Sequence, residues 1–339
     1  MLLFIIYNYR QMTNPLYKDE PYIANDRTEL LDNLKTYGVS IVPNVLNAEE
    51  CTSLESGMWK DIEFITQNFE TPIKKNDNST WNEWHKLYPK HSMLMQHYQI
   101  GHTQTVWDIR QNPKVVKPFT DIWNVDSPSD LLCSFDGISF HMPPEQTKRG
   151  WFRNNWLHTD QSYTRNQFEC IQGWVTANEV REGDGTLTFL KGSHKYHKAV
   201  ATKFNLTDKA DWIKLTPDIY NFYVKNCNCI QECIKCPAGS MVLWDSRTIH
   251  CGREPTRGRD KENIRCIVYV CMTPRCLATP ASLKKKRKAF EELRMTTHWP
   301  HKPKLFGKQP RTYGGPIPNV TEIATPVLTD LGRRLAGYE

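Results

Sequence analysis

The sequence has no long apolar run, and this absence excludes several classes of protein. None of the apolar stretches in its 339 residues reaches the roughly 18 to 20 residues that a membrane-spanning helix needs. The apolar start MLLFIIYNYR lacks the basic segment and the small-residue cleavage site of a secretion signal. No nucleotide-binding fingerprint, helix-turn-helix, zinc-finger or RNA-binding signature is present, and no segment repeats. We therefore expect a cytoplasmic protein without a membrane span, whose translation starts at Met12.

The composition is typical of a soluble globular protein, with 39% hydrophobic and 24% charged residues. The 44 Lys and Arg residues exceed the 37 Asp and Glu residues, which gives a net charge of +7. Much of this excess lies in the run LKKKRK, Leu283 to Lys288. We interpret the run as the solvated face of a helix, with contact to a nucleic acid or another anionic partner as the alternative. The 11 cysteines, without a secretion signal, indicate reduced thiols.

Hydrophobic patterns divide the chain into a helical first part and a strand-rich second part. Helical spacing and caps predict helices over residues 25–38, 47–68 and 112–124, with a strand at 39–46 and a loop at 71–92. From about residue 130, short strand-like runs bounded by Gly, Pro, Asp and Asn indicate an antiparallel sandwich or barrel. We expect a flexible arm over residues 1–20, one mostly β domain with flanking helices over 21–275, and a C-terminal helix and extended tail over 276–339 packed on it.

Three side chains suited to iron lie in two of the strand-like segments. NNWLHTDQSYT holds His158 and Asp160, whose spacing of two can direct both side chains to one side of a strand and its exit. Such a pair is common by chance, and a strand that merely carries both residues is the alternative. VLWDSRTIHCG adds His250, 92 residues later (250 − 158), so the three can meet only across a folded sandwich. Two imidazoles and one carboxylate form the facial triad of mononuclear non-heme Fe(II) enzymes.

An arginine inside a strand is suited to anchor a second reactant. Arg265 lies within the apolar segment NIRCIVYV, where a charge is costly unless it is paired. A dicarboxylate that chelates the iron would present its far carboxylate to the guanidinium fork. The alternative is that Arg265 points outward or pairs with an acidic side chain of the protein. Arg253, Arg257 and Arg259, in the polar loop before it, are weaker candidates.

Taken together, these motifs resemble one enzyme family. WLHTDQ, QGWVTANEVREGDGTLTFLKGSHKYH, GSMVLWDSRTIHCG and IRCIVYVCMTP follow one another over roughly residues 95–275. In this order they are similar to the phytanoyl-CoA dioxygenase-like (PhyH) family of Fe(II)- and 2-oxoglutarate-dependent oxygenases. The chain departs from the family pattern at Lys191, where proline is usual, and at Gly252, where a hydroxyl is often found. An insert, EPTRGRDKE, also lengthens the spacing between His250 and Arg265.

The resemblance implies a double-stranded β-helix, or jelly roll, with iron held by His158, Asp160 and His250. It implies that Arg265 holds 2-oxoglutarate and that Trp174 lines the cosubstrate pocket. Hydroxylation of a substrate would accompany conversion of 2-oxoglutarate to succinate and carbon dioxide, with ascorbate as reductant. Asp160 favours hydroxylation over halogenation, because related halogenases carry a small residue there.

Two other functions remain as alternatives to this oxygenase. One is a catalytically silent jelly-roll binding protein, and the other is a cupin-type metalloenzyme that does not use 2-oxoglutarate. We expect a small-molecule substrate, which the sequence does not identify. Protein and nucleic-acid substrates stay open.

Four cysteines form a second cluster of metal-ligand type within ten residues, in KNCNCIQECIKC. They are Cys227, Cys229, Cys233 and Cys236. Four thiolates can hold a structural zinc ion, but here one short loop would have to wrap the whole tetrahedron. We therefore favour free, partly buried thiols, with zinc and disulfides as alternatives.

Further polar and aromatic residues near the two motifs are candidates for the pocket wall: Asp136, His141, Asn154, Asn155, Trp156, Gln161 and Tyr163. We favour a structural role for His141, and we interpret His194 and His197 as turn histidines near the surface. The tail segment MTTHWPHKPKLF either closes over the pocket as a lid or simply packs on the barrel.

Overall fold

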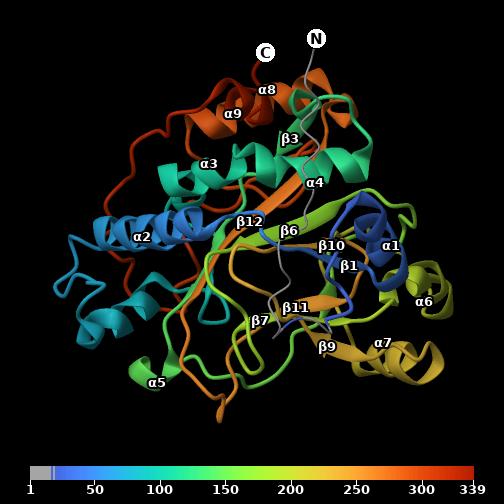
Figure 1. The fold of residues 1–339 in the computed structure, drawn as a ribbon, viewed down its shortest axis with the longest axis horizontal. Helices are drawn as coiled ribbons and strands as arrows, with labels where there is room; N and C mark the ends of the chain where they lie inside the picture. The colour runs from blue at the N-terminus through green and yellow to red at the C-terminus, as the bar shows by residue number, and fades with distance from the viewer. Residues whose placement is uncertain (1–16, 18–19) are drawn as a thin grey trace.

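The computed structural model describes residue 17 and residues 20–339 (Figure 1). Met12 and nearly all of the expected arm over residues 1–20 lie outside the described residues. Two antiparallel sheets form the centre of the molecule, and helices cover it, as the sequence predicts. None of the helices in the described part of the chain is long and apolar enough to cross a membrane.

The larger sheet has seven strands in the order β1-β10-β6-β12-β4-β2, with β3 also paired to β12. Their bounds are β1 Val39–Val42, β2 Leu94–Met95, β3 Leu131–Cys133, β4 Ile138–His141, β6 Ile171–Thr176, β10 Met241–Asp245 and β12 Arg265–Pro274. β12 is ten residues long and pairs on both sides, so it forms the spine of this sheet.

The smaller sheet has five strands in the order β8-β5-β11-β7-β9. Their bounds are β5 His158–Thr159, β7 Thr186–Leu190, β8 Ile213–Lys214, β9 Gln231–Cys233 and β11 His250–Arg253. From β4 to β7, and again from β9 to β12, consecutive strands alternate between the two sheets. This winding is that of a double-stranded β-helix, and the predicted jelly roll is confirmed.

Nine α-helices occur within the described residues: α1 Arg27–Tyr37, α2 Ala48–Ile65, α3 Gln104–Arg110, α4 Pro113–Trp123, α5 Pro144–Thr147, α6 His197–Lys203, α7 Pro217–Asn221, α8 Pro280–Glu291 and α9 Asp330–Leu335. The first two begin where capping residues predict. Asp26 accepts from the Glu29 N–H at 2.9 Å, and Asn47 forms a capping box with Glu50. Gly38 ends α1 at φ 81°, where a side chain would collide with Thr248.

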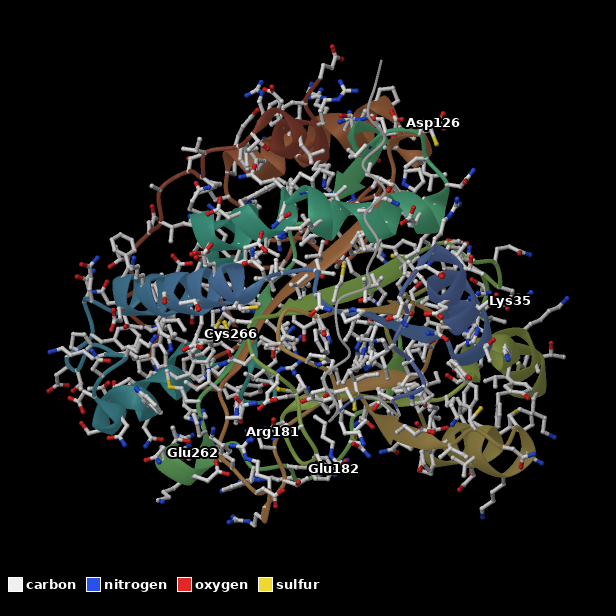
Figure 2. The ribbon with its side chains drawn as sticks, viewed as in Figure 1. Lys35, Asp126, Arg181, Glu182, Glu262 and Cys266 are labelled. Carbon is white, nitrogen blue, oxygen red and sulfur yellow. The ribbon has the colours of Figure 1, made fainter. Side chains whose placement is uncertain are left out.

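Helices α2, α3 and α4 pack against β12 on the outer face of the larger sheet (Figure 1). An aromatic cluster joins Trp107 of α3 to Phe290 of α8 and to Phe135, which lies between β3 and β4. Figure 2 shows charged side chains such as Lys35 and Glu262 at the periphery, whereas the buried Cys266 lies inside. The apolar faces of these helices therefore cover the outer face of the larger sheet, and the space between the two sheets is lined by strand residues.

Some local expectations were wrong. The predicted loop over residues 71–92 contains a 3-10 helix, Asn78–Leu87, and α3 was not predicted. The basic run in α8 is not wholly solvated, because Lys286 is buried there with its ammonium 4.0 Å from the Phe135 ring centroid. Lys286 also donates to the Cys133 carbonyl, so one lysine of the run belongs to the core.

Candidate metal centre

His158, Asp160 and His250 meet at the inner face of the smaller sheet. His158 is the first residue of β5 and His250 the first of β11, and the two residues are direct partners across the antiparallel pair. Asp160 directly follows β5. All three side chains are buried, and one potential ligand atom from each lies within 4.8 Å of the others. Strand pairing thus brings together residues that are 92 positions apart in sequence (250 − 158).

Hydrogen bonds orient both imidazoles toward the carboxylate. His158 Nδ1 lies 3.2 Å from the Trp156 carbonyl oxygen, and His250 Nδ1 lies 2.9 Å from the Thr248 carbonyl oxygen. A carbonyl can only accept, so each Nδ1 carries the proton and each Nε2 has its lone pair free. These Nε2 atoms lie 3.5 Å and 3.3 Å from the Asp160 carboxylate oxygens. The arrangement has the hydrogen bonding that fixes the tautomer of metal-ligating histidines.

Burial and charge favour the protonation states that metal ligands need, a neutral imidazole and an ionised carboxylate. Burial lowers the pKa of His158, which favours its neutral, ligating form. Burial raises the pKa of Asp160, but while no metal ion occupies Nε2, positive charge on His158 and His298 and hydrogen bonds from the imidazoles outweigh that effect. The pKa of Asp160 therefore falls well below its ordinary value, and the carboxylate is ionised. A neutral imidazole beside an ionised carboxylate suits a divalent cation.

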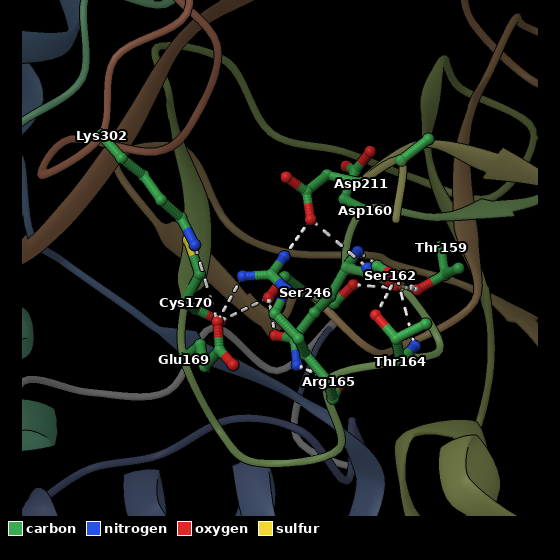
Figure 3. Close-up of polar contacts among 12 residues, drawn as sticks. Thr159, Asp160, Ser162, Thr164, Arg165, Glu169, Cys170, Asp211, Ser246 and Lys302 are labelled. Carbon is green, nitrogen blue, oxygen red and sulfur yellow. Dashed lines mark hydrogen bonds and ion pairs between the residues drawn. The ribbon is translucent and has the colours of Figure 1, made fainter. Parts of the chain in front are cut away.

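A network behind the carboxylate holds its position. Gln172 of β6 donates its amide N–H to Asp160 Oδ2 at 2.9 Å. The Asp160 N–H donates to the Ser246 carbonyl at 3.0 Å, and the Ser246 hydroxyl donates to the Cys170 carbonyl at 2.9 Å (Figure 3). In the tail, His298 Nε2 donates to the Asp160 carbonyl over 3.3 Å. Asp160 is thus fixed from three separate segments of the chain.

The loop after Asp160 is tied to the same region by ion pairs. Arg165 pairs with Glu169 and with Asp211, and Lys302 of the tail lies 3.7 Å from Glu169 (Figure 3). These contacts join the segment that carries Asp160 to the tail. They leave Asp211 with two cationic partners, since Lys304 also lies 3.3 Å from it.

Arg265 points inward from β12, as one of the two sequence interpretations requires. It is 6% exposed, its Nε donates to the Ser139 hydroxyl at 2.8 Å, and its Nη1 donates to the Gly185 carbonyl at 2.7 Å. Among the described residues no acidic side chain lies within ion-pair distance of it, and Glu145 and Asp184 pair with Arg259 instead. The Tyr269 side chain also hydrogen-bonds the guanidinium. A buried guanidinium without a counterion is suited to pair with a carboxylate.

Unpaired indole N–H groups lie beside this arginine and beside the histidines. The guanidinium carbon of Arg265 lies 5.6 Å from the Trp174 ring, and the Trp174 indole N–H has no hydrogen-bond partner among the described residues. Trp244, whose ring centroid lies 5.3 Å from that of His250, likewise has an unpaired indole N–H there. Buried donors without acceptors are rare in native structures, and of these two indole groups Trp244 lines the cavity described next.

A cavity of about 630 Å³ opens beside the three candidate ligands. Aromatic side chains form much of its wall, with polar groups between them. Its lining residues include Lys90, His91, Asp136, Trp156, His158, Asp160, Gln172, Leu187, Asp211, Trp212, Trp244, His250, Tyr269, His298, Trp299, Lys304 and Phe306. Volume and composition suit a small organic molecule.

Some pocket-wall predictions agree with this cavity and others do not. Asp136 and Trp156 line it. Gln161 and Tyr163 were wrong, because they face away: the Gln161 amide donates to two loop carbonyls, and the Tyr163 hydroxyl lies 3.2 Å from that of Tyr223. Three other candidates are absent from the cavity lining: His141, Asn154 and Asn155. The expectation that His194 and His197 lie near the surface was wrong, because both are buried, with ring nitrogens 3.1 Å from the Lys35 and Ser162 carbonyl oxygens.

Sequence reasoning missed several residues of the wall. Gln172 and Tyr269 are polar positions within apolar strands, each on the same strand face as a predicted site residue. Gln172 lies two positions before Trp174 in β6, and Tyr269 lies four positions after Arg265 in β12. The period of two was the signal that could have identified both.

The tail does contribute to the cavity. Thr297, His298, Trp299, Lys304 and Phe306 all line it, from a turn closed by the Thr297 N–H, which donates to the Lys304 carbonyl at 2.9 Å. A segment with no recognisable period in sequence is therefore part of the site.

The four clustered cysteines do not gather around a common point. All are unpaired thiols, Cys236 is fully buried and Cys229 nearly so. In the part of the chain that the structure describes, no three of them lie within ligand distance of one another. Cys233 instead accepts from the Arg253 guanidinium at 3.0 Å, so the segment shows separate thiol environments.

Comparison with known proteins adds independent information. The family model described as phytanoyl-CoA dioxygenase (PhyH) matches residues 34–257, which is more than half of the chain. A curated relative, Ava biosynthesis cluster protein O from Aspergillus versicolor, is 28% identical over 278 residues, covering 80% of this chain and 85% of the relative.

Two solved structures share the fold. A hypothetical protein from Escherichia coli has a TM-score of 0.53 and 15% identity, covering 91% of this chain and 80% of that one. GlcNAc Inducible Gene 2 from Candida albicans has a TM-score of 0.53 and 13% identity, covering 90% of this chain and 75% of that one. At such identities the likeness concerns the fold alone.

Proposed function

The chain belongs to the phytanoyl-CoA dioxygenase family, and on that premise we propose that it is an Fe(II)- and 2-oxoglutarate-dependent oxygenase that hydroxylates a small molecule. The observation that carries the proposal is the buried group of His158, Asp160 and His250 with both Nε2 lone pairs directed at one carboxylate. Two imidazoles and one carboxylate are the donor set of the facial triad, which suits ferrous iron and leaves positions open.

The residues present fit such an ion. Because each Nδ1 is engaged by a carbonyl, only Nε2 of His158 and His250 can ligate. Asp160 offers one oxygen while Gln172 holds the other, which keeps the carboxylate in one orientation. When bound, Fe(II) would supply the open positions at which 2-oxoglutarate and dioxygen react to give succinate, carbon dioxide and an oxidised substrate.

For 2-oxoglutarate we propose a position between the triad and Arg265. The guanidinium would bind the far carboxylate, which supplies the counterion that the described residues do not provide. The unpaired N–H groups of Trp174 and Trp244 are the donors available to its oxygens. The substrate would occupy the aromatic cavity beside the triad.

The direct test is succinate formation by the purified protein with Fe(II), ascorbate, dioxygen and 2-oxoglutarate. We expect turnover above the metal-free background even without the substrate, because the cosubstrate can react uncoupled. Asp160→Ala should abolish it, whereas Asp126→Ala, at an exposed site at the periphery, should not (Figure 2).

The result also discriminates between the alternatives. Metal binding without succinate formation would favour a metalloenzyme that does not use 2-oxoglutarate. Absence of both metal and 2-oxoglutarate binding would favour a silent jelly-roll binding protein. An Asp160→Ala variant with full turnover would refute the assignment of the carboxylate.

A further inference from the structure

Asp136 places a carboxylate in the wall of the cavity with little to neutralise it. It lies between β3 and β4, is 8% exposed, and lines the same cavity as the triad. One carboxylate oxygen accepts from the Gly137 N–H at 2.9 Å. No hydrogen bond or ion pair from the described residues reaches the other oxygen. Burial raises the pKa of this carboxyl group, as is expected of an acid whose charge has no close partner.

The cationic groups around Asp136 are engaged elsewhere. Arg110 donates to the backbone carbonyls of Asp136 and Gly101, not to the carboxylate. Lys90 donates to the Gln96 amide oxygen at 2.9 Å. His298 lowers the Asp136 pKa only through its charge, and its Nε2 bonds the Asp160 carbonyl. The protein therefore surrounds this carboxylate with positive groups but supplies none of them as its ion-pair partner.

Aromatic side chains form much of the rest of the wall. Tyr269, Trp299 and Phe306 line the cavity together with Trp156, Trp212 and Trp244. Aromatic faces attract organic cations, and the attraction grows when water is excluded. A buried carboxylate among aromatic rings is the combination that recognises an ammonium or amidinium group, whereas a neutral hydroxyl would leave the charge unpaired.

We propose that the cavity selects a substrate that carries an organic cation, bound by Asp136 beside the metal centre. The substrate class is therefore an amine, amidine or guanidine attached to an apolar body that the aromatic walls enclose. The inference rests on the proposed function for the statement that this cation belongs to the substrate. The binding of the cation itself does not depend on turnover.

The test uses three probes of matched shape: 3-phenylpropylamine, 3-phenylpropan-1-ol and 3-phenylpropionate. Their dissociation constants are measured by calorimetry on the full chain with Ni(II) and 2-oxoglutarate, and again with neither. The amine should bind about 10- to 100-fold more tightly than the alcohol, as expected of a hydrogen bond between charged groups. The carboxylate probe should bind the weakest.

Asp136→Asn keeps the shape and the acceptor for the Gly137 N–H, so the preference for the amine should disappear while binding of the alcohol persists. Asp211→Asn is the matched control, because that acid lines the same cavity but is already paired with Arg165 and Lys304. It should keep the preference.

The outcomes separate this inference from the proposed function. If the unmodified protein forms succinate but binds the alcohol as tightly as the amine, or binds neither, the inference is overturned and the oxygenase stands. That comparison needs no variant and survives a failure of Asp136→Asn to fold. If the amine preference depends on Asp136 but no succinate forms, the cation site stands and the oxygenase fails.

Discussion

Replacing Gln172 with leucine tests whether the support of Asp160 controls metal affinity. Gln172 is 7% exposed in β6. Its backbone is paired on both sides, opposite Trp244 and Cys271, and this pairing fixes the position from which its side chain extends. Its amide N–H donates to Asp160 Oδ2 at 2.9 Å. Leucine has a similar volume but no donor, so Gln172→Leu removes the hydrogen bond without opening a large cavity.

Two estimates of the effect agree. A hydrogen bond to a charged group contributes about 1.5 to 3 kcal/mol. Loss of an outer partner of a metal ligand typically costs about 10- to 100-fold in metal affinity, which corresponds to about 1.4 to 2.8 kcal/mol. We therefore expect the dissociation constant for Fe(II) or Co(II) to rise by about 10- to 100-fold in Gln172→Leu.

The assay is anaerobic calorimetric titration of the metal, with the metal-induced rise in melting temperature as a second measurement. Gln111→Leu is the matched control, because Gln111 is also 7% exposed but its amide accepts from Thr329 at 2.9 Å and does not line the cavity. This control should leave metal affinity unchanged. Wild-type affinity in Gln172→Leu would refute the reasoning, since Asp160 would then hold its orientation unaided.

Three further changes probe other parts of the structure. Arg265→Lys keeps the positive charge but removes the two parallel N–H donors of the guanidinium, so the dissociation constant of 2-oxoglutarate should rise by about tenfold or more. Unchanged affinity would contradict the proposed role of Arg265. Burial lowers the pKa of Lys286 from 10.5 to about 7, so between these values the unfolded chain binds more protons and stability rises with pH. Urea unfolding at about pH 7 and about pH 9 should show this rise, and Lys286→Met should reduce it. Trp107→Ala should lower the free energy of unfolding by about 3 to 5 kcal/mol in the same assay, because the ring is fully buried against Phe135 and Phe290. A loss below about 1 kcal/mol would show that the cluster contributes little.

Local signals in the sequence predicted elements whose cause is local. The caps Asp26 and Asn47 act on backbone groups within four residues, so α1 and α2 begin where the sequence indicates. Apolar runs bounded by turn residues likewise predicted β6, β7, β10 and β12. The two-residue strand β8 was not predicted, because pairing with β5, not its own composition, makes it a strand.

Residue types, together with the resemblance of their order to one family, singled out His158, Asp160, His250 and Arg265, because few side chains suit iron or a carboxylate. Which neighbours complete the site was decided by strand register. Gln172 lies on β6 of the larger sheet and Asp160 follows β5 of the smaller one, so their hydrogen bond joins the two sheets.

What the sequence by itself determined is therefore the fold class, the helix starts and the chemical type of the centre, since each depends on periodicity or on rare side-chain chemistry. Tertiary structure alone decided that residues 297–306 form part of the cavity wall and that Asp136 faces the cavity without a counterion. Both follow from packing between segments that are distant in the chain, and such contacts leave no periodic trace in the sequence.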